Sequence, residues 1–360
     1  MTEYFDIIIA FAASAFVSLL AIPFIIGYCK IYHLYDQPNA RKVHKQAIPR
    51  LGGMVFLPAM VIGLFISLQL RYGNGEIELR TSTMLMILGA IMIYVIGFID
   101  DLKGMHARTK FMIQTIAALF MPLCNLQIND LHGFLGLHAL PLWASYPLTV
   151  FVILLIVNAI NLIDGIDGLA SSLSMLILGS YTILYLDLNA QLFYLLCASL
   201  TGSVLMFFLF NMFGKTGHWK TFMGDTGSLF LGYVIAYVAI KYQMSNSAIF
   251  DYRDNSLLIS WTLVFIPCID VIRVALFRLK NGKGMFDADK THIHHLVMQA
   301  GASMHTALVS ILLLFVCFCL INWGLYTFKL NITWIILTDI TVYGLFIAAI
   351  SALGSNKSAN

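Results

Sequence analysis

The stretch FVILLIVNAINLIDGIDG, residues 151–168, joins a run apolar enough to lie in lipid to a turn rich in polar side chains. The turn contains two carboxylates that are each followed by a glycine, Asp164 and Asp167, and Asn158 and Asn161 precede them. Because charged side chains are costly in the middle of a bilayer, we expect this turn to lie at a membrane surface. Glycine there allows the chain to reverse direction.

The composition of the 360-residue chain indicates a protein that is mostly dissolved in lipid. Hydrophobic residues make up 60% of the chain and charged residues only 11%, whereas soluble domains contain about 25% charged residues. The six cysteines form no C-x-x-C pair and no zinc-binding spacing, so we expect them to be buried. The first apolar run is flanked by Glu3 and Asp6 and by no basic residue, which favours a retained span over a cleaved leader.

Eleven apolar segments approach the length of about 20 residues that a helix needs to cross a membrane. They lie near residues 5–29, 51–70, 82–99, 110–125, 143–161, 168–187, 191–212, 226–242, 257–278, 306–326 and 332–353. The segment near 110–125 is the weakest, because it is short and contains Gln114 and Pro122. We therefore predict an all-α polytopic integral membrane protein with about eleven transmembrane helices, forming a single domain over residues 1–360.

The distribution of basic residues predicts the orientation of these spans. With the N-terminus outside, sixteen of the 21 Lys and Arg residues fall on the inner side and five on the outer side. Cytoplasmic loops of membrane proteins carry such an excess of Lys and Arg. One span more or fewer would exchange the sides of the later loops and remove this excess. We predict an outside N-terminus and a cytoplasmic C-terminus, which places the turn at 161–168 on the cytoplasmic face.

The other predicted cytoplasmic loops carry polar motifs as well. GFIDDLKG ends one span with Asp100 and Asp101, and GKTGHWKTFMGDTGS places Asp225 where another span begins. A later loop contains FDADKTHIHHL, whereas the predicted outer loops are short or plain. We expect an active site formed by the cytoplasmic loops, which lie near residues 30–50, 100–110, 161–168, 213–226 and 279–305.

Each of these motifs also has an ordinary structural explanation. A lone Asp at a helix start, such as Asp225, commonly caps the helix, and Asp-Gly pairs are common in turns. Adjacent carboxylates can form a solvated rim, and HIHH can be a helix end lying on lipid headgroups. Their joint placement on one membrane face favours a site, because carboxylate and Asn oxygens suit Mg²⁺ and nearby Arg and Lys suit phosphates. The pattern predicts a diphosphate site.

With these motifs in order along the chain, the sequence resembles the polyprenyl-phosphate N-acetylhexosamine-1-phosphate transferases. The matching stretches are DQPNARKVHKQAIPRLGG, FIDDLKG, NAINLIDGIDGLA, FMGDTGS and DADKTHIHHL, and they cover about residues 30–300. PRLGG and HIHH resemble the WecA/TagO branch, which uses UDP-N-acetylglucosamine, more than the MraY branch. The sequence departs from the WecA-like pattern at Gly104, where a further Asp is often found.

The resemblance implies a transferase that works at the cytoplasmic face of a bacterial inner membrane. The phosphate of undecaprenyl phosphate attacks the sugar-linked phosphorus of UDP-N-acetylglucosamine, UMP leaves, and a lipid-diphospho-sugar remains. The implied partners are these two substrates and the lipid bilayer. A homodimer is compatible with the sequence, and nothing in it indicates nucleic-acid binding. The implied cofactor is Mg²⁺ or Mn²⁺, with Asp225 as a metal ligand and Asn161 adding an oxygen.

The resemblance also implies roles for further residues. Asp100, Asp101 and Asp225 are the implied catalytic residues, the first two orienting or deprotonating the lipid phosphate. Direct attack and a double-displacement route through a carboxylate nucleophile both remain open. Implied substrate-binding residues near the nucleotide are Lys45, Asp164, Asp167 and Phe222, and those near the diphosphate and sugar are Arg278, His292, His294 and His295.

Alternatives remain at two levels. Within the family, the donor could instead be UDP-N-acetylgalactosamine, a deoxy-N-acetylhexosamine derivative or UDP-N-acetylmuramoyl-pentapeptide. The product could feed O-antigen, common antigen, teichoic acid or capsule. A membrane transporter is a more remote alternative, since transporters place charges near mid-bilayer on broken helices and commonly contain repeats, whereas the charges here lie at the predicted ends of spans.

Overall fold

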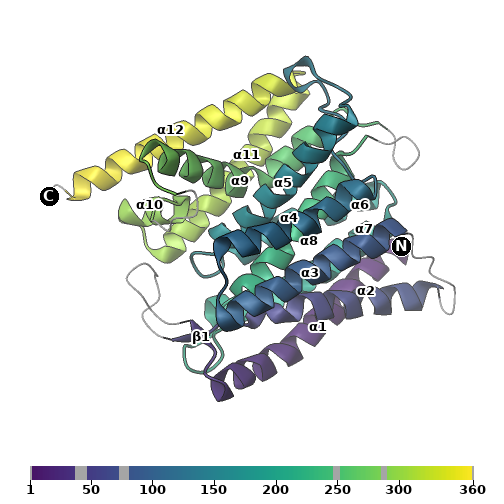
Figure 1. Ribbon diagram of the computed structural model, residues 1–360, viewed down its shortest axis with the longest axis vertical. Helices are drawn as coiled ribbons and strands as arrows, with labels where there is room; N and C mark the ends of the chain where they lie inside the picture. Colours follow the sequence, from purple (N-terminus) through teal and green to yellow (C-terminus); the bar gives the residue numbers. More distant parts are fainter. Residues whose placement is uncertain (1, 37–46, 73–80, 246–251, 285–289, 359–360) are drawn as a thin grey trace. The chain divides into compact units, whose positions relative to one another are not determined.

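The computed structural model describes residues 2–36, 47–72, 81–245, 252–284 and 290–358, and this part of the chain is almost entirely helical (Figure 1). Two short strands, β1 (Tyr35–Asp36) and β2 (Ile48–Pro49), pair antiparallel, and η1 (Gly52–Val55) and η2 (Phe134–Gly136) are single 3₁₀ turns. The α-helices are α1 (Thr2–Ile31), α2 (Phe56–Tyr72), α3 (Thr81–Lys103), α4 (Ala107–Leu123), α5 (Leu142–Ile163), α6 (Leu169–Asp187), α7 (Gln191–Phe213), α8 (Gly224–Gln243), α9 (Ser256–Lys280), α10 (Ile293–Gln299), α11 (Met304–Thr327) and α12 (Ile332–Ser358).

Each of the eleven predicted spans is a helix, which confirms an all-α polytopic membrane protein. Among the described residues, nine helices are long and apolar enough to cross a membrane. The other two predicted spans are α4 and α8. The 17 residues of α4 cover about 26 Å, slightly less than a hydrocarbon core of about 30 Å. The first turn of α8 is polar, with Asp225 and Thr226. The count of eleven and the orientation stay predictions.

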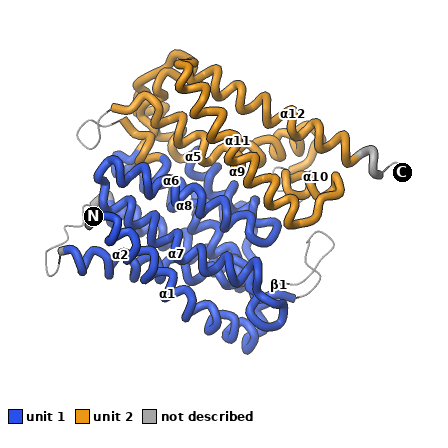
Figure 2. The backbone as a smooth tube through the Cα atoms, turned by 180° about the vertical axis from the view of Figure 1, so that it is seen from behind, with its two compact units in different colours: residues 1–126, 152–239 blue, residues 127–151, 240–360 orange. Residues whose placement is uncertain are grey.

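The chain divides into two compact units, which Figure 2 shows in different colours. Unit 1 contains residues 1–126 and 152–239, and unit 2 contains residues 127–151 and 240–360. The division falls within α5 and α8, so each of these helices contributes to both units. The single domain predicted over residues 1–360 stays a prediction.

Small residues bring the helices of unit 1 close together. Ser18 of α1 donates a 2.7 Å hydrogen bond to Ser203 of α7. A Cβ added to Gly202 of α7 would lie 2.2 Å from the Phe11 carbonyl oxygen of α1. Such small residues allow helix backbones to approach each other in membranes, where apolar burial alone gives little driving force.

The PRLGG motif packs against the chain that enters α8. The Phe222 amide donates to the Pro49 carbonyl at 2.7 Å, and the Gly52 amide donates back to the Phe222 carbonyl at 2.9 Å. A Cβ on Gly53 would lie 2.4 Å from the Cα of Gly227 in α8. Glycine is therefore needed where these two segments meet, and their contact fixes the start of α8.

Unit 2 contains a buried polar cluster among α9, α11 and α12. Asp339 is fully buried, and its Oδ2 accepts hydrogen bonds from Trp261 Nε1 and Asn322 Nδ2, both at 2.9 Å. Asn322 Nδ2 also lies 2.8 Å from Thr262 Oγ1. Buried polar groups in membrane proteins need such partners because lipid supplies none, so this cluster ties the three helices together.

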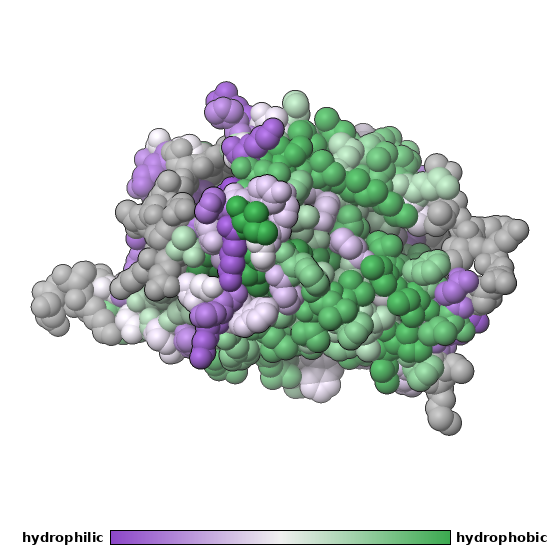
Figure 3. Space-filling view, turned by 90° about the horizontal axis from the view of Figure 1, so that it is seen from below, coloured by the Kyte–Doolittle hydropathy of each residue, from purple (hydrophilic) through white to green (hydrophobic). Residues whose placement is uncertain are grey.

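Large apolar side chains are exposed on both units, as expected for a protein surrounded by lipid. Examples are Phe24 and Leu88 of unit 1 and Leu313 and Trp334 of unit 2. Figure 3 shows apolar residues covering much of the face in view. A surface of this kind would be an aggregation hazard in water, so the protein is an integral membrane protein.

Candidate active site

Carboxylates from two helices of unit 1, α3 and α8, meet around one lysine. Lys110, in the first turn of α4, places its Nζ 2.8 Å from Asp100 Oδ2 and 3.0 Å from Asp225 Oδ1. Asn161, near the end of α5, donates its amide to Asp225 Oδ1 at 2.5 Å and to Ser228 Oγ at 2.8 Å. Of the residues that the sequence predicts for the site, Asp100, Asp225 and Asn161 are therefore brought together. These three residues and Lys110 are called the carboxylate–lysine cluster below.

The sequence pattern did not single out Lys110, which is one of several basic residues near the start of the weakest predicted span. Its place follows from the short connection between α3 and α4, where Gly104 has a φ of 71°. Such a left-handed conformation suits glycine. The reversal sets the first turn of α4 beside the last turn of α3, and thereby Lys110 beside Asp100. A short loop between two antiparallel helices is the signal that could have indicated this pair.

Asp101 lies next to Asp100 in sequence but makes different contacts. Asp101 is 4% exposed, and its carboxylate accepts hydrogen bonds from the backbone amides of Asp225 and Thr226, both at 2.9 Å. The N-terminal amides of a helix have no partner within the helix, and Asp101 of α3 supplies one for α8. The structure therefore places Asp101 as a support for Asp225. Its predicted contact with a lipid phosphate stays a prediction.

The DGIDG turn between α5 and α6 is held by contacts with other helices. Asp167 forms an ion pair with Lys220 at 2.5 Å. The amide of Gly168, where φ is 80°, donates to Asn211 Oδ1 of α7 at 2.7 Å. Asn211 Nδ2 in turn donates to the Thr221 carbonyl at 2.9 Å. Asn211, which the motifs did not indicate, thus links the turn to the segment that precedes α8.

Asp164 is solvent-accessible in the same turn, yet protein surrounds it on most sides. This partial removal from bulk water, followed by the charges of Asp225 and Asp167, raises the pKa of Asp164 to about 7. A carboxyl group with such a pKa is an expected neighbour of a bound cation, because positive charge would relieve the repulsion from the other carboxylates.

The two remaining predicted residues of the nucleotide pocket differ in what the structure shows. Phe222 is half-buried and is held by the backbone hydrogen bonds to the PRLGG segment. Lys45 lies outside the described residues. The predicted roles of Phe222, Lys45 and Asp167 in binding the nucleotide therefore stay predictions.

In unit 2, Asp270 of α9 organises the start of the HIHH segment. Asp270 is 1% exposed, and its Oδ2 lies 2.8 Å from His292 Nδ1. Its Oδ1 accepts from Arg273, from the Ile293 amide and from Tyr343 of α12, at 2.6, 3.1 and 3.0 Å. A carboxylate on Nδ1 fixes the orientation of an imidazole, so Asp270, which had no predicted role, sets the position of His292.

The other predicted residues of unit 2 are His294 and His295 of α10 and Arg278 of α9. His294 is 1% exposed, and neither of its ring nitrogens has a hydrogen-bond partner among the described residues. Burial, and then the neighbouring His295 and His292, lower its pKa to about 3, so the ring is neutral at physiological pH. The His294 ring centroid lies 4.2 Å from that of His295. Arg278 is buried near the end of α9.

The carboxylate–lysine cluster suits a divalent cation in part. Among the described residues, no three His, Cys, Asp or Glu side chains are grouped to hold a metal. Mg²⁺, however, is often held by one or two carboxylates, with substrate phosphates and water completing its shell. Asp100 and Asp225 already converge on one positive charge, the Lys110 ammonium. Asn161 presents its amide nitrogen to Asp225, so it would have to turn over to offer its oxygen to a metal.

The fold and the cluster define an integral membrane protein with a site of acidic and basic groups, suited to phosphate ligands and a cation. Residues 83–243 match the model of glycosyl transferase family 4. The chain is also 30% identical over 309 residues to a probable undecaprenyl-phosphate N-acetylglucosaminyl 1-phosphate transferase of Bacillus subtilis (strain 168). That match covers 86% of this chain and 82% of the relative. The chain belongs to glycosyl transferase family 4.

Two further relatives support the same assignment. An undecaprenyl-phosphate alpha-N-acetylglucosaminyl 1-phosphate transferase of Salmonella typhi is 28% identical over 283 residues, and the protein of that name from Escherichia coli (strain K12) is 26% identical over 283 residues. Both matches cover 78% of this chain and 73% of the relative. The resemblance inferred from the five motifs is confirmed.

Proposed function

We propose that this protein transfers N-acetylglucosamine-1-phosphate from UDP-N-acetylglucosamine to undecaprenyl phosphate and releases UMP. The names of the relatives support both substrates. The observation that carries the proposal is the carboxylate–lysine cluster, in which Lys110 lies between Asp100 and Asp225. The reaction would take place at the cytoplasmic face of a bacterial inner membrane, as the distribution of basic residues predicts.

The chemical difficulty is that one phosphate anion attacks another. An oxygen of the lipid phosphate forms a bond to the sugar-linked phosphorus of the donor, and the bond from that phosphorus to the bridging oxygen breaks. The electron pair of the broken bond stays with the bridging oxygen of UMP. Positive charge at the reacting phosphates reduces the repulsion and stabilises the leaving group. Lys110 supplies one such charge, and a bound Mg²⁺ or Mn²⁺ would supply two more at the diphosphate.

The residues of unit 1 would have different roles in the reaction. Asp225 and Asp100 would hold the cation, and Asp100 would also orient the lipid phosphate, whose second pKa near 6 leaves little need for a base. Asp101 would act by fixing the start of α8, and with it Asp225. Asn161 would hold the Asp225 carboxylate in place. The route through a covalent carboxylate intermediate remains the alternative.

The motifs of unit 2 carry a second part of the proposal. His292, His294, His295 and Arg278 would bind the diphosphate and the sugar of the donor, as the family resemblance implies. Asp270 supports this role for His292, because it fixes the imidazole through Nδ1. The neutral His294 ring, which is without a hydrogen-bond partner among the described residues, would then be able to accept a hydrogen bond from a sugar hydroxyl.

The proposal is tested by UMP release from purified protein in detergent or nanodiscs. The assay combines undecaprenyl phosphate with UDP-N-acetylglucosamine and, separately, with UDP-N-acetylgalactosamine, a UDP-deoxy-N-acetylhexosamine and UDP-N-acetylmuramoyl-pentapeptide. We expect UMP and a lipid-linked sugar only with the first donor. Turnover with a different donor would correct the sugar and keep the reaction. No UMP from any donor, with folded protein and Mg²⁺ present, would contradict the proposed reaction.

A further inference from the structure

No motif of the sequence assigns a role to α12, the last helix of unit 2. The family model matches residues 83–243, and the matching motifs end near residue 300, whereas α12 begins at Ile332. Yet α12 lies beside α10, the short helix that contains His294 and His295 (Figures 1 and 2). The contribution of α12 to the site therefore follows from its own contacts.

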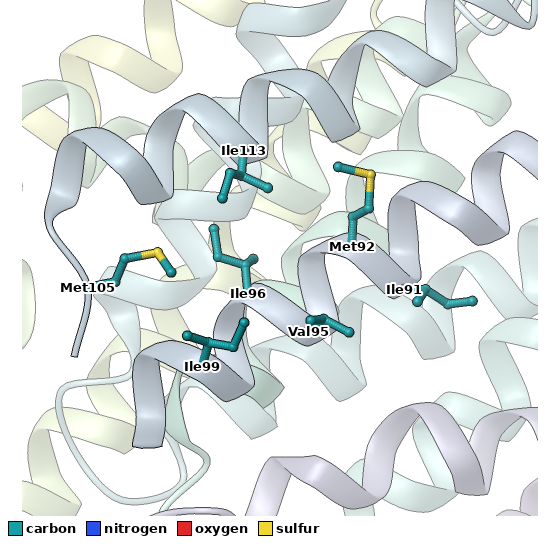
Figure 4. A pocket seen from close by; sticks show the side chains of 7 residues that line it. All are labelled: Ile91, Met92, Val95, Ile96, Ile99, Met105 and Ile113. Atoms are coloured by element: carbon teal, nitrogen blue, oxygen red, sulfur yellow. The ribbon is translucent and has the colours of Figure 1, made fainter. Parts of the chain in front are cut away.

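Polar contacts connect α12 to the predicted donor-binding residues, and such contacts are directional. The pocket between α3 and α4 of unit 1 offers a comparison, because all seven side chains that line it, among them Val95 and Ile113, are apolar (Figure 4). Apolar burial is non-directional, whereas the strength of a hydrogen bond depends on its angle. The polar contacts of α12 can therefore orient a particular side chain.

Two buried polar side chains one turn apart, Asp339 and Tyr343, connect α12 to α9. Asp339 accepts a hydrogen bond from Trp261 of α9 at 2.9 Å. Tyr343 is 2% exposed, and its hydroxyl donates to Asp270 Oδ1 of α9 at 3.0 Å. The ring of Phe265 lies edge-on to the Tyr343 ring, with the centroids 6.0 Å apart. The Tyr343 ring is therefore held in place, and its hydroxyl has a defined direction.

The two carboxylate oxygens of Asp270 have different partners. Oδ1 accepts from Arg273, from the Ile293 amide and from Tyr343, whereas Oδ2 lies 2.8 Å from His292 Nδ1. Because the donors to Oδ1 come from three parts of the chain, the carboxylate cannot rotate without breaking their hydrogen bonds. Oδ2 thus stays directed at His292, and the other ring nitrogen, Nε2, is left for a ligand.

The same helix also contacts the far end of α10. A Cβ added to Gly354 of α12 would lie 3.7 Å from the amide nitrogen of Ala300, the residue that follows α10. At the other end of α10, the Ile293 amide donates to Asp270, which is also the acceptor of Tyr343. A change at Tyr343 is therefore expected to act on His292 and the start of α10, while the contact at Gly354 is kept.

We propose that Tyr343 is a positioning residue for the nucleotide-sugar donor. Its hydroxyl fixes the Asp270 carboxylate, the carboxylate fixes the His292 ring through Nδ1, and the ring presents Nε2 to the donor. The inference rests on the proposed function, which makes a UDP-sugar the donor and His292 one of its contacts. It adds to that function a residue of the last helix, which acts through Asp270 and does not touch the substrate.

The test removes one hydroxyl group from α12. Tyr343→Phe keeps the ring and its contact with Phe265, and Asp270 Oδ1 keeps two of its three donors, so the fold is retained. Tyr326→Phe is the matched control, because the Tyr326 hydroxyl donates to the Asp254 carboxylate at 2.8 Å. Tyr326 also lies at the end of α11 that is farthest along the chain from α10. For each protein, the KM for each of the two substrates and the thermal unfolding midpoint are measured.

We expect Tyr343→Phe to raise the KM for UDP-N-acetylglucosamine about fivefold, roughly the net contribution of one hydrogen bond. The KM for undecaprenyl phosphate should match that of the Tyr326→Phe control, because His292 is assigned to the donor alone. A donor KM equal to that of the control would overturn the proposal. An equal rise in the KM of both substrates would also overturn it, since that result indicates a general loss of structure.

A double-mutant cycle shows whether Tyr343 acts through His292. The Kd of UDP-N-acetylglucosamine is measured by calorimetry for wild type, Tyr343→Phe, His292→Gln and the double variant. Once His292 is replaced, loss of the Tyr343 hydroxyl should weaken binding no further, because residues that act through one contact are not additive. Additive losses would mean that Tyr343 acts by another route and would overturn the proposal.

Nitrogen-15 NMR of histidine-labelled protein in lipid separates this inference from the proposed reaction, because it needs no substrate. The Nδ1 signal of His292 is identified by its absence in His292→Gln. We expect this signal to shift in Tyr343→Phe and to keep its position in Tyr326→Phe. A shifted signal in protein that releases no UMP from any donor would support the positioning of His292 and count against the proposed reaction only. An unshifted signal in Tyr343→Phe would overturn the inference.

Discussion

Asp101 Oδ2 accepts two hydrogen bonds from Thr226, one from its backbone amide at 2.9 Å and one from its Oγ1 at 2.6 Å. A carboxylate on α3 therefore caps α8, a helix that begins more than a hundred residues later. The contact is close, because a Cβ on Gly224 would lie 2.6 Å from the same Oδ2. Two adjacent carboxylates thus have different surroundings: Asp101 faces the backbone of α8, and Asp100 faces Lys110.

The first prediction concerns Asp101→Asn. The amide can replace one acceptor oxygen, but its NH₂ group would face a backbone N–H donor of α8. Because a buried donor left without an acceptor costs about 1–3 kcal/mol, we expect the thermal unfolding midpoint to fall and UMP release to fall with it. The matched variant is Asp100→Asn, which changes the neighbouring carboxylate and should lower turnover with little change in the midpoint. Equal midpoints for the two variants would contradict the capping role of Asp101.

Thr226 allows the same contact to be tested from the other side. Thr226→Ser keeps the hydroxyl that donates to Asp101, whereas Thr226→Val removes it and keeps the branched shape. We expect the valine variant to be less stable than the serine variant, by about 1.5–3 kcal/mol for a hydrogen bond lost from a charged acceptor. Chemical denaturation followed by far-UV circular dichroism gives the comparison.

The second prediction concerns Lys110→Met, which removes the positive charge between Asp100 and Asp225. We expect turnover to fall by roughly a hundredfold or more, a typical cost of removing one charge-stabilising group from an active site. Lys103→Met is the control, because Lys103 is exposed at the end of α3 and its substitution changes the net charge equally. Similar turnover in both variants would mean that Lys110 contributes only to the net positive charge of the protein and not through its contacts with Asp100 and Asp225.

The sequence predicted the helices well, because each one is a long apolar run and length alone identifies such runs in a membrane protein. The sequence also predicted that Asp100, Asp225 and Asn161 share one site, since each lies where a predicted span begins or ends. That placement follows from the alternation of spans across the membrane, so it required no knowledge of side-chain contacts.

The contacts that distinguish these residues could not be predicted in this way. Asp101 and Thr226 are 125 positions apart, and no periodic pattern links them. The contacts of Asp270 are equally hard to predict, because its partners His292 and Tyr343 lie 22 and 73 positions later in the chain. Lys110 was interpreted as one of many basic residues on the inner side, and only the packing of α4 against α3 shows its partners.

The third prediction concerns metal removal. If Asp100 and Asp225 hold a divalent cation, excess chelator should abolish UMP release, and Mg²⁺ or Mn²⁺ in excess of the chelator should restore it. Asp225→Asn should reduce turnover strongly, and any remaining activity should need a higher metal concentration, because an amide oxygen is a weaker ligand than a carboxylate. The measurement is the metal dependence of turnover in both proteins. Full activity in excess chelator would exclude a required, exchangeable metal.

The fourth prediction concerns the dependence of stability on pH and follows from His294. In the unfolded chain this side chain binds a proton near pH 6.5, whereas in the folded protein burial lowers its pKa to about 3. Between these two values the unfolded state holds more protons, so acidification favours unfolding. Below pH 6.5 the contribution of this residue should approach about 1.4 kcal/mol for each pH unit.

His294→Gln should remove this contribution and keep a side chain of similar size. The measurement is the thermal unfolding midpoint at about pH 7.5 and about pH 5.5, a range that spans the unfolded pKa. Wild-type protein should lose more stability on acidification than the variant does. His106→Gln serves as the control, because His106 is exposed and its replacement leaves the buried ring in place. If wild type and His294→Gln lose equal stability, His294 either gains a proton inside the fold or is not buried as the structure shows.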